Sequence, residues 1–167
     1  MKLYKILCTG NPNKPTIASA VKNLYPESDF IHQSNGFDLR LWDKERKEKF
    51  INKVKSYNVF INASHISHMA QYDLLNTVLE NWTSGTIINI GSIAEHQSDY
   101  KKYYVEKNTL KLRSLQIKGK IKSTHITIPG INDGKLGHEN WMPLTEVSQL
   151  IKFVLESKVH IQLIQAI

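Results

Sequence analysis

The sequence lacks both the cysteine pairs of a secreted protein and the long apolar runs of a membrane protein. Its single cysteine, Cys8, excludes an intrachain disulfide, and its place in an apolar run favours inert packing. No apolar run approaches the roughly 20 residues of a membrane helix, and the N-terminus lacks the pattern of a cleavable signal peptide. We therefore expect no membrane partner and a reducing, cytoplasmic location.

Composition is that of an ordinary globular domain. A chain of 167 residues can bury a sizeable core, and 41% hydrophobic with 22% charged residues is typical of globular proteins. The net charge of +7 would suit an anionic partner, but lysines spread over helices also serve solubility. Aromatic and basic residues do not interleave as on a nucleic-acid platform, so polynucleotide binding stays a minor alternative and no nucleic-acid partner is expected.

Apolar strands and amphipathic helices alternate along the whole chain. Strands are predicted at 3–8, 29–33, 37–39, 58–64, 86–90, 123–128 and 159–167. Helices are predicted to begin near residues 16, 42, 72, 103 and 143. This alternation predicts an α/β fold, a three-layer, Rossmann-like, doubly wound parallel sheet of about seven strands, in a single domain spanning 1–167.

The stretch 86–107 carries the strongest chemical signal. Ser92 follows a buried strand and so lies at the carboxyl end of a central strand, where open α/β sheets bind ligands. Tyr103 and Lys107 are four residues apart and share one helix face. An ammonium near a phenol lowers the pKa of the phenol, and a serine hydroxyl would complete a site that protonates a carbonyl oxygen. A solvated helix face explains the Tyr103–Lys107 pair alone at least as well.

The first predicted strand ends in a turn that suits a phosphate. Thr9 and Gly10 close the strand, and a helix capped by Thr16 follows the loop 11–15. In this geometry the amino end of the helix faces a phosphate. A turn without a ligand explains the same residues.

These pieces, in this order, resemble the short-chain dehydrogenase/reductase family over nearly the whole chain. The motifs that carry the resemblance are Thr9-Gly10, Asp38-Leu39, Asn62-Ala63-Ser64, Ser92, the Tyr103–Lys107 pair and Pro129-Gly130. The sequence departs from the family in being shorter, with losses in the central helix, the active-site helix and the lid. Thr16-Ile17-Ala18 also stands where the family has Gly-x-Gly.

The resemblance implies reversible reduction of a small carbonyl compound to its alcohol with a nicotinamide cofactor. Ser92 would bind the substrate oxygen, Tyr103 would donate the proton, and Lys107 would bind the nicotinamide ribose and lower the Tyr103 pKa. The residues that the resemblance assigns to the cofactor are Thr9, Gly10, Asn11, Asn13, Lys14, Thr16, Ile17, Ser34, Asn35, Asp38, Leu39, Asn62, Ala63, Ser64, Tyr103, Lys107, Pro129, Gly130 and Ile131.

The end of the second predicted strand favours NADP over NAD. An acidic residue at this place binds the ribose of NAD, whereas a phosphorylated ribose needs neutral or basic groups. The sequence offers Ser34 and Asn35 there, with Lys14 on the neighbouring turn and no carboxylate. Asn76 is the one candidate for the family's catalytic asparagine, although the sequence does not fix its register.

Several alternatives stay open at this point. The altered glycine turn would also suit a catalytically inactive nucleotide-binding or protein-interaction protein on the same fold. His65 and His68 are three residues apart, but no carboxylate or cysteine at ligand spacing supports a metal, so none is expected. Trp141 and His138 either line the pocket or plug the core edge. The resemblance also implies a homodimer or homotetramer that partly buries 110–115.

Overall fold

In the computed structural model, the described residues are 4–64, 69–96 and 101–166. The elements among them are β1 (Ile6–Thr9), α1 (Ile17–Leu24), β2 (Asp29–Ile31), η1 (Gln33–Asn35), α2 (Lys44–Val54), β3 (Val59–Asn62), α3 (Ala70–Asn81), β4 (Gly85–Ile90), η2 (Ile93–His96), α4 (Lys101–Leu115), β5 (Ile121–Thr127), β6 (Ile131–Asn132), β7 (Met142–Pro143), α5 (Leu144–Glu156) and β8 (Leu163–Gln165). None of these helices has both the length and the apolar character needed to cross a bilayer.

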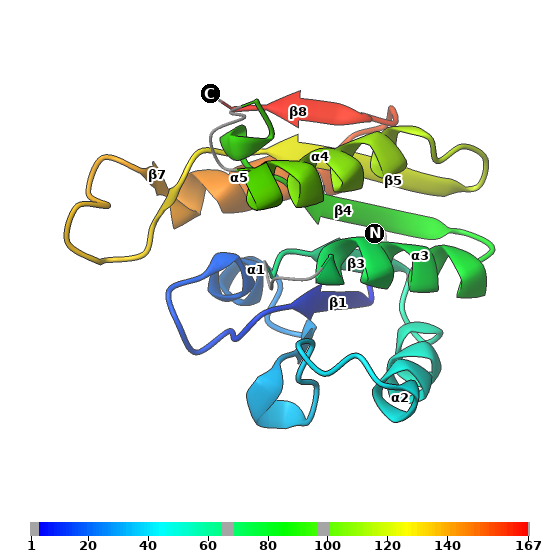
Figure 1. Ribbon diagram of the computed structural model, residues 1–167. Coiled ribbons are helices and arrows are strands. Elements are labelled where there is room, and N and C mark those ends of the chain that lie inside the picture. The colour runs from blue at the N-terminus through cyan, green and yellow to red at the C-terminus, as the bar shows by residue number, and fades with distance from the viewer. Residues whose placement is uncertain (1–3, 65–68, 97–100, 167) are drawn as a thin grey trace.

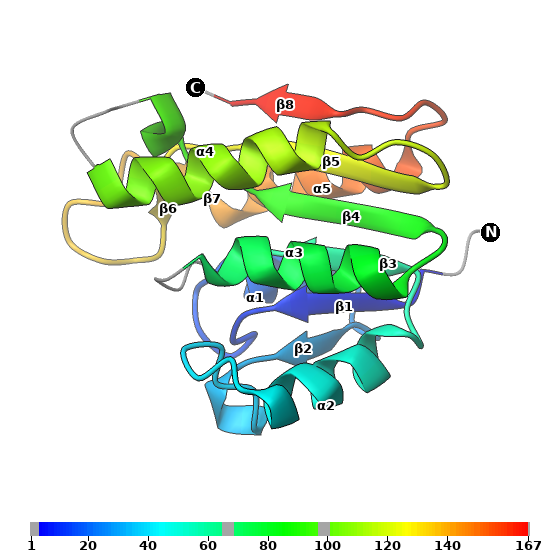
Figure 2. The same cartoon turned by 45° about the vertical axis from the view of Figure 1, so that its right-hand side comes forward.

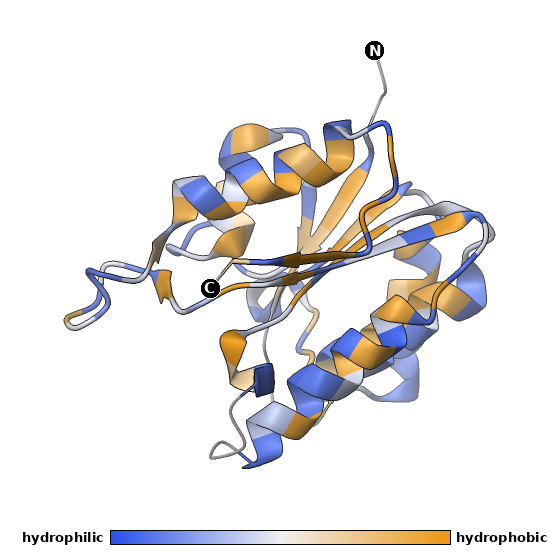
Figure 3. Cartoon of the chain, turned by 90° about the horizontal axis from the view of Figure 1, so that it is seen from above, coloured by the Kyte–Doolittle hydropathy of each residue, from blue (hydrophilic) through white to orange (hydrophobic). Residues whose placement is uncertain are grey.

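Six of the described strands form one parallel sheet in the order β2-β1-β3-β4-β5-β8, and β6 pairs with β7 in a small separate sheet (Figure 1). Neighbouring strands of the large sheet are parallel at every pairing. The helices lie on both sides of this sheet (Figure 3), and their buried apolar residues pack against it. The predicted three-layer, doubly wound α/β fold is therefore confirmed.

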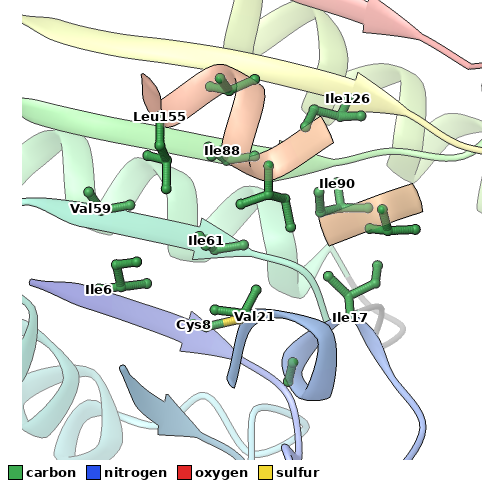
Figure 4. Packing of buried hydrophobic residues seen from close by; sticks show 14 of the residues in the cluster. Ile6, Cys8, Ile17, Val21, Val59, Ile61, Ile88, Ile90, Ile126 and Leu155 are labelled. Carbon is green, nitrogen blue, oxygen red and sulfur yellow. The ribbon is translucent and has the colours of Figure 1, made fainter. Parts of the chain in front are cut away.

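Each face of the sheet is buried by its own set of helices. On one face, α1 and α5 pack together over the side chains of Cys8, Ile61 and Ile88 (Figure 4). On the other face, α2, α3 and α4 cover Leu7 and Phe60, and α3 lies beside α4 (Figure 2). Because successive strand residues point to opposite faces, strands buried on both faces must be apolar throughout, which is the pattern in the sequence.

Cys8 is buried in the first of these clusters as a free thiol. Burial raises its pKa well above the ordinary value. Little of the reactive thiolate therefore forms, in agreement with the packing role expected from the sequence.

The sheet has six strands rather than about seven, because residues 37–39 form no strand and lead into a turn over 38–41. The Asp38 side chain accepts a hydrogen bond from the backbone amide of Arg40 at 3.1 Å, and the amide of Leu41 donates to the Asp38 carbonyl at 3.0 Å. Aspartate favours turns for this reason, since its side chain can bind the backbone two residues on. The last strand is also shorter than expected, covering Leu163–Gln165 within the predicted 159–167.

Candidate active site

A cleft of about 650 Å³ lies across the carboxyl ends of the central strands. The chain passes from β1 out to β2 and then returns across β1 to β3, so the sheet order reverses beside β1. Open α/β sheets bind ligands at such a switch point. The cleft therefore lies where this fold class places its ligand.

Most of the predicted site residues line this cleft. They are Thr9, Gly10, Asn11, Lys14, Thr16, Ile17, Asp38, Leu39, Ala63, Ser64, Ser92, Tyr103, Lys107, Pro129, Gly130 and Ile131.

Four predicted residues are not among the lining: Asn13, Ser34, Asn35 and Asn62. Asn35 instead holds its own turn, since its side chain accepts from the His32 amide at 2.9 Å and donates to the Phe30 carbonyl at 2.6 Å. Asn13 is exposed and its side chain accepts from Lys22. A polar side chain that follows a strand can hydrogen-bond the backbone of its own turn as readily as a ligand. The position of these residues in the sequence therefore did not distinguish the two roles.

The floor of the cleft is formed where the ends of β1 and β3 meet. The Thr9 hydroxyl accepts hydrogen bonds from the backbone amides of Ala63 and Ser64, both at 2.8 Å. Gly10 has a φ of +127°, and a Cβ added there would lie 2.9 Å from the Ala18 Cβ and 3.2 Å from the Ser64 Oγ. Only glycine fits this turn, because both the backbone conformation and the space exclude a side chain.

The amino end of α1 opens onto the same cleft. Thr16 occupies the N-cap position of α1, and its backbone amide donates to the Ser19 hydroxyl at 3.1 Å. The Thr16 hydroxyl donates to the Asn11 carbonyl at 3.0 Å, which closes the loop before the helix. Thr16 and Ile17, together with the small Ala18, line the cleft. The positive end of the helix dipole therefore faces the cleft, an arrangement that favours a bound anion.

At the other end of the cleft, the structure brings Ser92, Tyr103 and Lys107 together. Ser92 follows β4, and its side chain is hydrogen-bonded to the Tyr103 hydroxyl. The Lys107 ammonium lies 5.6 Å from the centre of the Tyr103 ring, one helical turn along α4. The serine and the phenol can therefore contact one substrate oxygen together, with the ammonium behind them.

The pKa of Tyr103 is shifted in the direction opposite to the one expected. Burial raises it, the hydrogen bond with Ser92 opposes that shift, and the charges of Glu106 and Glu95 raise it further. Burial also lowers the pKa of Lys107 to about 8, although Glu95 and Glu106 act in the opposite direction. In this structure the phenol therefore holds its proton at neutral pH while the ammonium is still charged.

Gln71 is a site residue that the sequence analysis missed. The Lys107 ammonium donates to the Gln71 Oε1 at 2.6 Å and to the Ile90 carbonyl at 3.1 Å. Gln71 lies in the first turn of α3, and its amide nitrogen donates to the Asn62 carbonyl at 2.8 Å. Asn76, the predicted candidate, instead accepts from the Arg113 guanidinium at 2.9 Å. The signal in the sequence that could have identified Gln71 is a polar residue at the amino end of a helix.

Asn62 holds the strands together behind the cleft. Its side-chain amide donates to the Gln71 carbonyl at 2.7 Å and to the Asn89 side chain at 3.0 Å. The Asn89 amide in turn donates to the Ser114 hydroxyl at 3.1 Å. This buried network ties β3 and β4 to α3 and α4, the elements that carry Gln71 and Lys107.

Trp141 forms a wall of the cleft beside β5. Its ring stacks on His138 with 3.6 Å between ring centres, and a Cβ added to Gly130 would lie 2.3 Å from its six-membered ring. The His138 Nδ1 lies 2.7 Å from a carboxylate oxygen of Asp133. The indole is therefore held between Gly130 and His138 and lines the cleft, one of the two roles left open for it.

The cleft has a basic end beside β2. His32, Gln33 and Arg40 line it there, together with Lys14. Asp38 is the one acidic residue among the described residues that line the cleft, and its carboxylate is paired with the Arg40 guanidinium at 2.5 Å. The hydrogen bonds from Arg40 lower the pKa of Asp38 to about 2, so the carboxylate is neutralised by the arginine.

Metal-ligating side chains do not gather in threes or more among residues 4–64, 69–96 and 101–166. His65 and His68 lie outside the described residues.

No model of a known protein family matches the sequence, and no curated protein matches it either. Solved structures do match. A short-chain dehydrogenase from Sphingobium yanoikuyae in complex with NADPH superposes with a TM-score of 0.73 at 10% identity, over 98% of this chain and 87% of that one. A glucose/ribitol dehydrogenase of the short-chain type from Brucella melitensis gives 0.70 at 12% identity, over 98% and 94%. The fold is that of the short-chain dehydrogenase/reductase family.

A further structure with the short-chain dehydrogenase fold, 4-hydroxyisoleucine dehydrogenase complexed with NADH and succinate, matches with a TM-score of 0.72 at 16% identity, over 96% of each chain. The resemblance noted in the sequence is thus confirmed at the level of the fold. The matches to these structures cover almost the whole of this chain.

Proposed function

We propose that this chain is an oxidoreductase of the short-chain dehydrogenase/reductase family that uses a nicotinamide dinucleotide to interconvert a small carbonyl compound and its alcohol. The observation that carries the proposal is the hydrogen bond between Ser92 and Tyr103, with Lys107 one helical turn from Tyr103. All three residues line the same cleft as Gly10. Two of the similar structures were solved with NADPH or NADH, which supports a cofactor of this class.

The residues present fit such a cofactor. Gly10 leaves free the space that a Cβ would fill, and the amino end of α1 faces the cleft, as a pyrophosphate requires. Lys107 would hold the nicotinamide ribose, and the backbone at Pro129, Gly130 and Ile131 would support the nicotinamide. When bound, the cofactor would supply or accept the hydride.

The protein's own residues would handle the substrate oxygen. Ser92 would donate a hydrogen bond to this oxygen, and Tyr103 would give it a proton as the carbonyl is reduced. A raised Tyr103 pKa keeps that proton available at neutral pH. Holding the reacting carbons in contact would provide much of the remaining acceleration.

We further propose NADP rather than NAD as the cofactor. Lys14 and Arg40 line the β2 end of the cleft, and the carboxylate of Asp38 is already paired with Arg40. A phosphate on the adenosine ribose would be attracted there, whereas the ribose of NAD would lack a free carboxylate partner. Arg40→Ala should therefore weaken NADPH binding at least tenfold and, by freeing Asp38, leave NADH binding unchanged or stronger. Equal weakening of both would contradict this assignment.

The proposed function is tested first by titrating the protein with NADPH and NADH and monitoring nicotinamide fluorescence. The second step is a screen of small aldehydes and ketones as substrates. Binding of either cofactor together with turnover of at least one carbonyl compound is the expected result. Absence of binding at millimolar cofactor would overturn the proposal and leave a non-catalytic interaction protein on this fold. Salt-dependent retention on a DNA or RNA column would instead indicate a nucleic-acid partner.

We also propose that two or more copies associate through α4, giving a homodimer or homotetramer. Val105 and Leu112 are seven residues apart on this helix and are each 54% exposed. Leu110, expected in such an interface, is only 1% exposed because it packs in the core of its own chain. Light scattering should give a particle mass that is a multiple of the 19.2 kDa chain mass, and Val105→Glu should lower the measured mass. A monomer mass for the unaltered protein would contradict association.

A further inference from the structure

A second buried cluster lies behind the site, formed by Glu95 on η2 and by His125 and Thr127 on β5. All three side chains are almost fully buried, and none is among the described residues lining the cleft. His125 Nε2 lies 3.0 Å from one carboxylate oxygen of Glu95, and the Thr127 hydroxyl donates to the other oxygen. Both oxygens of the carboxylate are thus held in place.

The cluster lies directly against the turn that carries Ser92. The Glu95 amide donates to the Ser92 carbonyl at 2.9 Å. The His125 ring fills the space beside Gly91, where a Cβ would lie 2.2 Å from His125 Nε2 and 3.2 Å from the Glu95 carboxylate. The position of Ser92 is therefore tied to the position of Glu95 and His125.

The hydrogen bonding of His125 indicates the charge of the cluster. Its Nδ1 is buried and has no hydrogen-bond partner among the described residues. A neutral imidazole with its proton on Nε2 donates to Glu95 and leaves only a lone pair unpaired, whereas a protonated ring would bury an unpaired N–H. Burial likewise lowers the pKa of His125, although Glu95 opposes that shift. The histidine is therefore neutral.

Glu95, by contrast, is ionised. Burial opposes ionisation, but each carboxylate oxygen faces a hydrogen-bond donor, His125 Nε2 on one and the Thr127 hydroxyl on the other, and these bonds favour the charged form. With a neutral His125, the cluster carries one net negative charge. A buried charge needs a counter-charge nearby.

Lys107 is a buried cation that reaches the same turn. Its ammonium donates to the Ile90 carbonyl at 3.1 Å, and the Glu95 carboxylate lies against the next residue, Gly91, where an added Cβ would be 3.2 Å from it. Lys107 is 3% exposed, and its two hydrogen-bond acceptors, Gln71 and the Ile90 carbonyl, are uncharged. The titratable groups that act on this region are Tyr103, Glu106 and Lys111 on α4, Glu95 on η2 and His125 on β5. A buried ammonium loses its proton unless negative charge is close by, and of the two carboxylates Glu95 has the larger effect on Lys107.

We propose that Glu95 is a positioning residue of this site, acting as the counter-ion that keeps Lys107 charged while anchoring the Ser92 turn. His125 and Thr127 hold the carboxylate in place and keep it ionised. The catalytic consequence rests on the proposed oxidoreductase function, but the charge relation between Glu95 and Lys107 does not.

The test is to follow the Lys107 ammonium by NMR in protein with 13C-labelled lysine, the signal being assigned by its absence in Lys107→Met. Glu95→Gln keeps the shape and removes the charge, since the Thr127 hydroxyl can turn to accept from the new amide. This variant should lower the pH at which Lys107 titrates by about one unit. Thr127→Val retains the charge and should move the titration little, and Glu106→Gln should move it less than Glu95→Gln. An unmoved titration in a folded Glu95→Gln protein would overturn the proposal.

The unaltered protein provides a second test, in case Glu95→Gln does not fold. Nitrogen-15 spectra of histidine should show His125 neutral at neutral pH with its proton on Nε2. A protonated His125 would make the cluster electrically neutral and overturn the proposal. Neither measurement needs turnover, so an enzyme-negative result would overturn the proposed function alone. Where turnover is found, Glu95→Gln should move the alkaline limb of the pH–rate profile to lower pH, and Glu95→Asp should restore part of that shift.

Discussion

The ammonium nitrogen of Lys107 lies 2.6 Å from the side-chain oxygen of Gln71, and both side chains are buried. A hydrogen bond from a charged donor at this distance is strong and fixes the direction of the ammonium. Gln71 is itself held by the Asn62 carbonyl, so the lysine is oriented by a network that extends into the sheet.

Replacing Gln71 by leucine should weaken NADPH binding by about tenfold, because a hydrogen bond to a charged group contributes on the order of 1.5–3 kcal/mol. The measurement is fluorescence titration with NADPH. Asn76→Leu is the matched control, since Asn76 lies on the same helix but bonds Arg113. If both variants bind NADPH equally well, Gln71 has no part in the site.

Tyr103→Phe should lower turnover by about 100-fold or more while leaving NADPH binding nearly intact, because only the donated proton is lost. Steady-state rates with the best carbonyl substrate and a parallel binding titration provide the comparison. Tyr104→Phe, one residue along the helix, should keep normal rates. Equal loss of binding and turnover, or loss of neither, would count against Tyr103 as the acid.

Lys107→Met tests the pKa of the buried ammonium through stability. Below pH 8 both the folded and unfolded protein carry the charge, and the folded state is penalised for burying it. Between about 8 and the ordinary value of 10.5 the unfolded chain binds a proton that the folded chain has released, so stability gained from Lys107 rises with pH. Urea unfolding should therefore show the unaltered protein gaining up to about 3 kcal/mol relative to Lys107→Met across this range. A constant difference would mean that Lys107 titrates normally.

Thr9→Val should destabilise the protein by about 2–4 kcal/mol, since it leaves two backbone amides without the hydroxyl that accepts from both. Thr9→Ser retains the hydroxyl and should cost much less. Chemical unfolding of the two variants gives the comparison. Similar losses in both would show that packing of the methyl group, and not the shared hydroxyl, holds the end of β1 to the end of β3.

The layered fold could be predicted because its main determinant is a set of strands that are apolar on both faces, and this pattern is visible in the sequence. The boundaries of the elements and the absence of the strand expected at 37–39 could not be predicted. Phe37 and Leu39 give the alternation of a strand, whereas the Asp38 side chain accepts from the Arg40 amide and closes a turn. Local hydrogen bonding of this kind overrides hydrophobic pattern.

The candidate site divides in the same way. Ser92, Tyr103 and Lys107 could be placed together from strand ends, helix spacing and the resemblance to the short-chain dehydrogenase/reductase family. The direction in which the pKa of Tyr103 is shifted could not be predicted, because the burial of this side chain depends on the whole fold. Gln71 was missed because its register depends on where α3 begins. His32 was missed because β2 ends at Ile31, inside the predicted strand 29–33, and Arg40 because a turn replaced the strand expected at 37–39.

The large sheet begins with β2 and finishes with β8, and each of these strands is three residues long. Unpaired strands at the margin of a sheet invite other chains to add themselves, and very short ones offer few donors and acceptors to do so. Both margins of the sheet therefore offer few backbone donors and acceptors to a strand from another chain.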